Sequence, residues 1–193
     1  MGMEPRRAII VGITSDIGSA IAERWLQAGV SLVGSYRTMS NAARALPLNA
    51  ESLFQCDFDS DESIQRFVSQ VGALRVGWNQ LVVCPGTMNP IGPFASIDFS
   101  EWEAGFRVNF ISTLRVIRGL LPFRDCSSGP PIVIVFAGGG VNSAPENFSS
   151  YTVSKIALIK MIELMAAELS DTRFVILGPG WVETKIHRET LES

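Results

Sequence analysis

The chain has 193 residues, of which 47% are apolar and 18% are charged, and its formal net charge is −3. This length and apolar content predict one globular domain over residues 1–193 with a large buried core, and exclude a mainly disordered chain. Neither half carries a Lys/Arg cluster, which argues against a nucleic-acid-binding surface. No apolar run approaches the ~20 residues of a membrane helix, so we expect no membrane partner.

The cysteines Cys56, Cys84 and Cys126 are widely spaced and odd in number. This pattern is typical of reduced thiols rather than of a disulfide framework or a metal site. Residues 1–7 lead directly into an apolar segment and lack the architecture of a signal peptide. We therefore expect a cytoplasmic protein with no bound metal.

The first predicted elements are a strand over residues 8–11 and a helix over residues 17–28, joined by a turn that contains Gly12 and Gly18. Four consecutive apolar residues suit a parallel strand that is covered on both faces. The tight turn aims unpaired N–H groups of the first helical turn outward, and such an anion site usually holds a dinucleotide pyrophosphate. The alternative is that the glycines mark close packing only.

The second predicted strand covers residues 31–35 and is followed by Tyr36 and Arg37. A dinucleotide-binding fold places the residue that contacts the ribose about 20 positions beyond the glycine turn, and Tyr36 falls there. An acid at this point takes the 2′-hydroxyl of NAD, whereas Arg37 can pair with the 2′-phosphate of NADP. The position therefore favours NADP(H), with NAD(H) as the alternative if Arg37 is an ordinary solvated residue.

The remaining predicted strands cover residues 53–57, 81–84, 132–136 and 174–177, and the predicted helices cover residues 61–71, 100–121 and 151–169. Ser100 with Glu103 has the pattern of a capping box at the start of the second of these helices. Strands that alternate with helices at this rhythm predict an α/β fold. The expected architecture is a doubly wound parallel sheet, the Rossmann fold, with about six strands and helices on both faces.

Motifs in the first half resemble those of the short-chain dehydrogenase/reductase family. The first turn of that family reads TGxxxGxG, in which Gly12 and Gly18 match, Val11 replaces the Thr and Asp16 replaces the middle Gly. Because Asp tolerates left-handed backbone conformations and caps helices, the turn can keep its geometry. Of the family's NNAG motif only the glycine survives, as Gly86, since Val and Cys replace the amides.

Motifs in the second half complete the resemblance in the family's order. A Val108-Asn109 pair matches the family's VN pair, and Tyr151 with Lys155 matches its YxxxK pair. Four residues apart, Tyr151 and Lys155 share one helix face with an apolar stripe, where a polar pair needs a functional reason. Asn109 lies inside a predicted helix, where simple exposure is its commonest explanation.

The resemblance implies an oxidoreductase that transfers hydride between a nicotinamide and a carbonyl or secondary alcohol. Tyr151 is then the general acid/base, Lys155 binds the nicotinamide ribose and lowers the pKa of Tyr151, and Asn109 holds a water of the proton relay. Asp57 matches a position that contacts adenine, although with Asp59, Ser60 and Asp61 it fits a helix cap equally well. The residues implied in cofactor binding are Gly12, Thr14, Ser15, Asp16, Ile17, Gly18, Arg37, Asp57, Phe58, Gly86, Lys155, Pro179, Gly180, Val182 and Thr184.

One feature of the family's catalytic set is missing. The substrate-polarising Ser or Thr lies about 13 positions before the Tyr, and here that position is Gly138, in a run of three glycines. Backbone N–H groups of this run, or the side chains of Asn142 or Ser143, are the candidates for holding the substrate oxygen. Loss of such a donor costs on the order of 10²–10³ in rate. The alternative function is a catalytically impaired nucleotide-binding protein that acts as a sensor or subunit.

The face of the Tyr151 helix opposite the catalytic pair is also apolar. It carries Val153, Ile156, Ala157, Leu164 and Ala167, interrupted by Lys160 and Glu163. A helix that is apolar on two sides is buried on both, which predicts a homodimer or homotetramer packed through this helix and the helix over residues 102–120. Pro179-Gly180 resembles the family's PG motif, and little of the segment that selects the substrate in the family follows it. The expected partner is therefore only a small-molecule carbonyl or alcohol. His187, the sole histidine, is expected to be a solvated residue.

Overall fold

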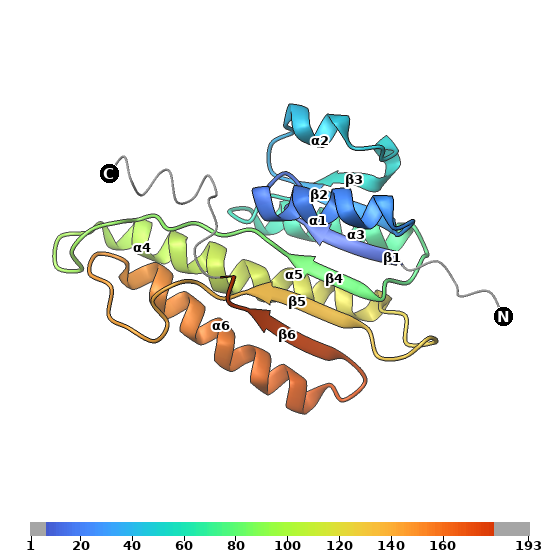
Figure 1. Ribbon diagram of the computed structural model, residues 1–193. Coiled ribbons are helices and arrows are strands. Elements are labelled where there is room, and N and C mark those ends of the chain that lie inside the picture. Colours follow the sequence, from blue (N-terminus) through green and yellow to red (C-terminus); the bar gives the residue numbers. More distant parts are fainter. Residues whose placement is uncertain (1–6, 180–193) are drawn as a thin grey trace.

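Six parallel strands form the centre of the computed structural model, which describes residues 7–179 apart from the side chains of residues 42, 43 and 50. The strands are β1 (Arg7–Val11), β2 (Ser31–Tyr36), β3 (Leu53–Gln55), β4 (Gln80–Val83), β5 (Ile132–Phe136) and β6 (Arg173–Leu177). Their order in the sheet is β3-β2-β1-β4-β5-β6, and every neighbouring pair is parallel (Figure 1). From β1 the chain adds strands toward one edge of the sheet, and from β4 it adds them toward the other edge. The point between β1 and β4 is where open α/β sheets bind their ligands. The predicted doubly wound sheet is confirmed.

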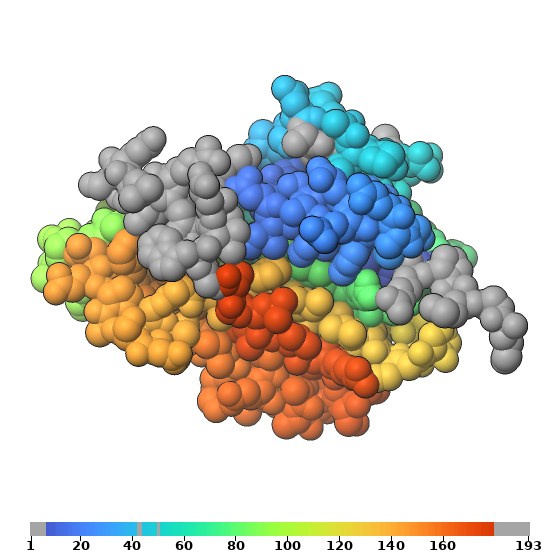
Figure 2. All heavy atoms as spheres, viewed as in Figure 1, coloured from blue at the N-terminus to red at the C-terminus, as the bar shows by residue number. Residues whose placement is uncertain are grey.

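Helices cover both faces of this sheet (Figure 1). The α-helices are α1 (Asp16–Gln27), α2 (Asn41–Ala45), α3 (Asp61–Ala73), α4 (Phe99–Phe106), α5 (Thr113–Leu120) and α6 (Ser149–Glu168). Between α4 and α5 lies a π-helical segment, η2 (Arg107–Ser112), and short 3₁₀ turns are η1 (Ala50–Ser52) and η3 (Leu121–Phe123). In the space-filling view α2 and its neighbours (cyan) project at one end of the molecule and α6 (orange) lies at the other (Figure 2).

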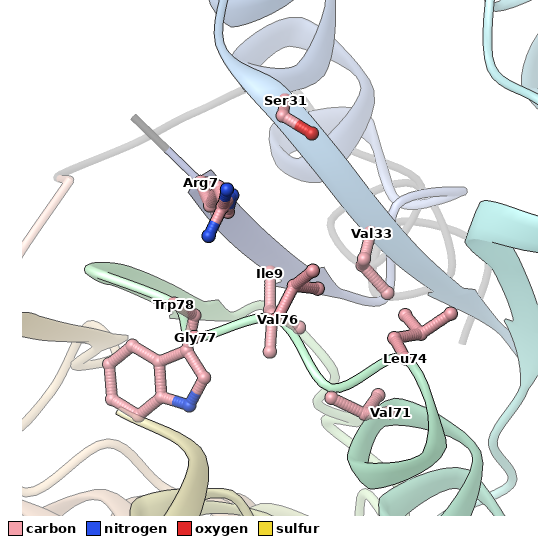
Figure 3. A pocket seen from close by; sticks show the side chains of 10 residues that line it. Arg7, Ile9, Ser31, Val33, Val71, Leu74, Val76, Gly77 and Trp78 are labelled. Atoms are coloured by element: carbon pink, nitrogen blue, oxygen red, sulfur yellow. The ribbon is translucent and has the colours of Figure 1, made fainter. Parts of the chain in front are cut away.

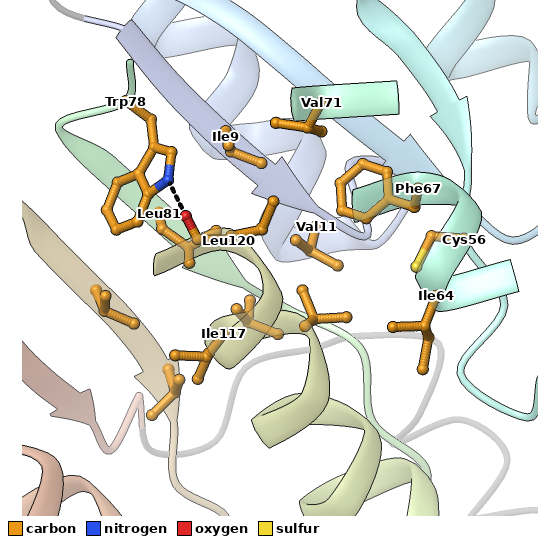
Figure 4. Close-up of a cluster of buried hydrophobic side chains, with 14 of the residues drawn as sticks. Ile9, Val11, Cys56, Ile64, Phe67, Val71, Trp78, Leu81, Ile117 and Leu120 are labelled. Carbon is orange, nitrogen blue, oxygen red and sulfur yellow. Dashed lines mark hydrogen bonds between the residues drawn. The ribbon is translucent and has the colours of Figure 1, made fainter. Parts of the chain in front are cut away.

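Strand β1 supplies both hydrophobic cores because its side chains alternate between the two faces of the sheet. Ile10 packs in the cluster that includes Ala22 of α1, and Ile9 packs in the cluster formed with α3, α5 and α6. In that second cluster, shown in Figure 4, the indole N–H of Trp78 donates a 2.9 Å hydrogen bond to the Leu120 carbonyl. The buried indole therefore has a partner for its polar atom.

The helix predicted over residues 100–121 differs from the structure in two ways. It begins at Phe99, because the Asp98 carboxylate accepts a 2.8 Å hydrogen bond from the Ser100 N–H and caps the helix. The predicted capping box of Ser100 with Glu103 is therefore wrong. The helix is also divided into α4, η2 and α5, and α6 begins at Ser149, before the predicted start.

Two further observations concern the whole described region. All three cysteines are free, as predicted. Within residues 7–179, no helix combines the length and the apolar character needed to cross a bilayer.

Candidate active site

The turn between β1 and α1 is built around two glycines. Gly12 has φ +76°, in the left-handed region that favours glycine. A Cβ on Gly18 would lie 2.3 Å from the Gly12 carbonyl oxygen, so that position also excludes a side chain. In addition, the Ser35 hydroxyl of β2 accepts a 3.1 Å hydrogen bond from the Gly12 N–H and fixes the turn against the sheet. The turn therefore has the shape that the resemblance implied.

Ser15, rather than Asp16, is the N-cap of α1. Its hydroxyl accepts a 3.0 Å hydrogen bond from the Gly18 N–H. Asp16 is the first helical residue, so neither a left-handed conformation nor a capping role explains it, and that part of the sequence argument is corrected. Its position in the first turn is one where the helix dipole favours a carboxylate.

The residues after β2 and β3 lie at the same edge of the sheet as this turn, because all the strands are parallel. Arg37 is exposed directly after β2, and its carbonyl accepts a 3.3 Å hydrogen bond from the Gln55 amide. After β3, Asp57 accepts a 3.1 Å hydrogen bond from the Asp59 N–H, while Ser60 is the N-cap of α3. The carboxylate of Asp57 therefore does not cap α3.

Phe58 is placed differently from the other predicted cofactor residues. Its side chain is buried in the larger hydrophobic cluster, and its carbonyl accepts a 2.6 Å hydrogen bond from the Ser112 hydroxyl. The side chain thus supports the fold beneath the site rather than facing a ligand.

Gly86, Asn109 and Lys155 meet beside the end of β4. A Cβ on Gly86 would lie 3.2 Å from the Asn109 Oδ1 and 3.7 Å from the Lys155 Nζ. Asn109 is fully buried, which removes exposure as the explanation of this residue. Its Oδ1 accepts a 2.9 Å hydrogen bond from the Thr87 N–H, and its Nδ2 donates a 2.8 Å bond to the Thr87 carbonyl. The side chain therefore fixes the loop after β4, and the π-helical widening of η2 carries it there.

Lys155 is only 6% exposed and donates a 3.1 Å hydrogen bond to the Phe136 carbonyl at the end of β5. Burial lowers the pKa of its ammonium to about 8, although the neighbouring Cys84 opposes this change. Burial also raises the pKa of Cys84 to about 12, against the opposing effects of a hydrogen bond with Ser15 and of Lys155. Cys84 therefore lies close enough to both Ser15 and Lys155 for each to lower its pKa.

Tyr151 lies next to Lys155, whose Nζ is 5.7 Å from the centroid of the tyrosine ring. Burial raises the pKa of the Tyr151 phenol above its ordinary value. The family resemblance implied that Lys155 lowers this pKa, and that expectation is wrong because desolvation of the phenolate raises it. The phenol is therefore protonated at neutral pH.

The glycine run after β5 lies against this tyrosine. A Cβ on Gly138 would lie 2.3 Å from the Tyr151 hydroxyl oxygen. The other two predicted substrate residues, Asn142 and Ser143, are exposed on the loop that follows, where the Ser143 N–H bonds the Gly140 carbonyl at 3.0 Å. Only Gly138 of these three is placed against the tyrosine.

The last group of predicted cofactor residues is only partly covered. Pro179 follows β6 and is exposed. Gly180, Val182 and Thr184, and also His187, lie outside the described residues.

A separate cavity lies at the opposite, amino end of the strands (Figure 3). Arg7 and Ser31, the first residues of β1 and β2, line it together with Trp78. Its volume of about 20 Å³ has room for about one water molecule. We therefore place the candidate site at the carboxyl edge of the sheet, where the polar groups converge.

Comparison with known proteins decides the family. The sequence model described as short chain dehydrogenase matches residues 6–193. The chain belongs to the short-chain dehydrogenase family. Members of this family are oxidoreductases that use nicotinamide cofactors and act on small-molecule substrates.

Individual relatives agree with this family. Human dehydrogenase/reductase SDR family member 4 is 28% identical over 189 residues, which cover 94% of this chain and 67% of that protein. The crystal structure of a short-chain dehydrogenase from Streptomyces avermitilis has a TM-score of 0.82 at 25% identity, over 96% of this chain and 69% of that one. A Pseudomonas aeruginosa RhlG/NADP active-site complex shares the fold, with a TM-score of 0.83 at 24% identity over 97% and 77% of the chains. This short-chain dehydrogenase thus spans about two thirds of the length of its curated relatives.

Two residues that support the site were missed from the sequence. Ser35 braces the glycine turn, and Thr87 is the partner of Asn109. The hydroxyl of Ser35 inside a mostly apolar strand was an available signal. The identity of Thr87 gave no such signal, because Asn109 bonds its backbone N–H and carbonyl and not its side chain.

Proposed function

We propose that this short-chain dehydrogenase is an NADP(H)-dependent oxidoreductase that transfers hydride between the nicotinamide and a carbonyl or secondary alcohol. The observation that carries the proposal is the convergence of Tyr151, Lys155, Asn109 and Gly86 at the carboxyl edge of the sheet. A Cβ on Gly86 would lie 3.2 Å from the Asn109 Oδ1 and 3.7 Å from the Lys155 Nζ, so these groups surround one point. Cys84, whose pKa both Ser15 and Lys155 lower, lies between that point and the capped glycine turn.

The chemistry proposed for Tyr151 is general acid/base catalysis. Its protonated phenol donates a proton to the carbonyl oxygen during reduction and takes one from the alcohol during oxidation. Lys155, held by the Phe136 carbonyl, binds ribose hydroxyls and supplies positive charge near the phenol. The Asn109 amide donates one hydrogen to the Thr87 carbonyl, and its second hydrogen is the proposed donor to a water of the proton relay.

The residues of the glycine turn fit a dinucleotide. Gly12 and Gly18 exclude side chains, and the first-turn N–H groups of α1 suit a pyrophosphate. When bound, the nicotinamide supplies or accepts the hydride. Exposed Arg37 after β2 and the lack of an acid at Tyr36 favour the 2′-phosphate of NADP(H) over NAD(H). The NADP complex of the structurally similar RhlG supports this preference.

We also propose a homodimer or homotetramer located in the cytoplasm. Val153, Ile156 and Leu164 of α6 are 46%, 46% and 49% exposed, although all three are large apolar residues. Figure 2 shows α6, in orange, at the surface of the molecule. Burial of this face against α6 and the α4–α5 segment of another copy would remove it from water.

A second candidate function is a nucleotide-binding sensor or subunit with impaired turnover. Gly138 in place of the family's hydroxyl residue is the observation that favours it. A panel of carbonyl compounds, assayed by loss of NADPH fluorescence with purified protein, separates the two functions. Turnover of any carbonyl above the protein-free rate supports the oxidoreductase, and NADPH binding without turnover across the panel supports the sensor.

A further inference from the structure

The helix that carries Tyr151 begins without a side-chain cap. Its N-cap residue is Phe148, which makes no capping hydrogen bond, and Tyr151 is the third residue of α6. The first turn of a helix has unpaired N–H groups and frays readily when no cap is present. The contacts that hold the first two residues, Ser149 and Ser150, therefore decide where the backbone of the tyrosine lies.

Trp102 of α4, the helix beside the start of α6 in Figure 1, makes both of these contacts. Its indole N–H donates a 3.0 Å hydrogen bond to the Ser149 hydroxyl, and its carbonyl accepts a 2.8 Å hydrogen bond from the fully buried Ser150 hydroxyl. The indole ring also stacks with Phe99 and Phe106, at centroid distances of 5.5 and 5.6 Å and interplanar angles of 2° and 8°. These ring contacts fix the direction in which the indole N–H points.

Gly105, one turn later in α4, allows this close approach. A Cβ on Gly105 would lie 2.4 Å from the Asn89 carbonyl oxygen and 3.0 Å from the Ser150 Oγ. Asn89 belongs to the loop after β4, and Asn109 fixes the same loop through its bonds to the Thr87 backbone. The helix α4 therefore contacts both the start of α6 and the loop that Asn109 holds.

From these contacts we infer that Trp102 is a positioning residue, which holds the first turn of α6 and thereby places the Tyr151 phenol relative to Asn109. The inference rests on the proposed function for its kinetic consequence. Proton transfer requires the phenol to be within hydrogen-bond reach of the substrate oxygen, and a displacement of about 1 Å costs on the order of 10²-fold in rate. Loss of the bond to Ser149 should therefore lower turnover without weakening the binding of the dinucleotide.

The kinetic test is a double-mutant cycle on the bond between Trp102 and Ser149. Trp102→Phe removes the indole N–H and keeps an aromatic ring, and Ser149→Ala removes the acceptor. We expect each variant to lower kcat at least about fivefold, with the Kd for NADPH within about twofold of the unsubstituted protein. The double variant should be slowed no more than about twofold beyond the slower single variant, because both substitutions break the same bond.

Trp25→Phe is the matched control for this cycle. It removes the same atoms from a tryptophan of α1 that packs against the other hydrophobic cluster, so kcat should stay within about twofold. Losses that multiply in the double variant, or single variants with the kcat of the unsubstituted protein, would overturn the inference.

Amide hydrogen exchange tests the same contact without turnover. The Thr152 N–H, in the first turn of α6, bonds the Phe148 carbonyl at 2.9 Å, and the amide of the buried Ile162 later in the helix is the reference. Trp102→Phe and Ser149→Ala should speed exchange at Thr152 at least about tenfold relative to Ile162, because only the start of the helix loosens. Trp25→Phe should leave this ratio unchanged.

The same exchange ratio in all four proteins would overturn the inference. The faster exchange at Thr152, combined with an unsubstituted protein that turns over no carbonyl of the panel, would contradict the proposed function and still support the role of Trp102 in holding α6.

Discussion

The buried ammonium of Lys155 should make the chain less stable than it would be without that charge. Burial lowers its pKa from 10.5 to about 8, so the folded state disfavours the charged form. At about 1.4 kcal/mol per pH unit, this difference corresponds to a penalty of about 3 kcal/mol in the free energy of unfolding. Lys155→Met removes the penalty but also removes the hydrogen bond to the Phe136 carbonyl, which contributes about 1 kcal/mol. We therefore expect Lys155→Met to raise the free energy of unfolding at pH 7 by about 2 kcal/mol.

The pH dependence of the free energy of unfolding tests independently whether the Lys155 charge is destabilising. Because Lys155 loses its proton at lower pH in the folded chain than in the unfolded chain, the unfolded state binds more protons between about pH 8 and pH 10.5. Between these two pH values, the titration of Lys155 makes the unsubstituted protein more stable as the pH rises. The advantage of Lys155→Met is therefore full below about pH 8 and is lost as the pH approaches 10.5.

Urea unfolding at pH 7 and at pH 10, followed by tryptophan fluorescence, measures both quantities. Arg66→Met is the control, because Arg66 is an exposed cation of α3 and lies away from the face of α6 that is proposed as an interface. Its removal should change stability by less than about 0.5 kcal/mol at either pH. The reasoning is refuted if Lys155→Met is no more stable than the unsubstituted protein at pH 7, or if its advantage is the same at pH 10.

Three further predictions concern other parts of the site and surface. Asn109→Ala leaves both backbone groups of Thr87 without their partner and should lower the free energy of unfolding by about 2 kcal/mol in urea titrations; a loss below about 0.5 kcal/mol would contradict the role assigned to this side chain. NADPH should bind at least several-fold more tightly than NADH in fluorescence titrations, and Arg37→Ala should remove the difference, whereas equal affinities in the unsubstituted protein would reject the preference. Ile156→Lys, on the exposed apolar face of α6, should convert the oligomer to monomer in light scattering; a monomeric mass before substitution would refute the proposed assembly.

The sheet was predictable from the sequence because its strands are short apolar runs separated by helical patterns. β1 shows why: each of its residues 8–11 is buried, on one face or the other, so the run carries a strong signal. The helix α2 was not predicted, since it spans only Asn41–Ala45 and has no sustained apolar period.

The site was predictable where the chemistry lies in side-chain motifs and not where it lies in tertiary packing. Tyr151, Lys155 and Asn109 were identified by spacing and order. Asn109 lies in the π-helical segment that divides the helix, and its partner is the Thr87 backbone, 22 positions earlier in the sequence, which no local pattern reveals. The sign of the Tyr151 pKa change depends on burial, which no local pattern reports.

The same limit applies to Gly138. In the sequence it is only the absence of a hydroxyl, and the contact with Tyr151 is visible only in the structure.

Steady-state turnover of Tyr151→Phe tests the central claim most directly. The variant keeps the ring that packs on Gly138 and loses only the hydroxyl that donates the proton. With the best carbonyl of the panel and saturating NADPH, we expect kcat to fall by about 10²–10⁴, while the Kd for NADPH changes by less than about twofold. Turnover by Tyr151→Phe at the rate of the unsubstituted protein would contradict the assignment of Tyr151 as the general acid.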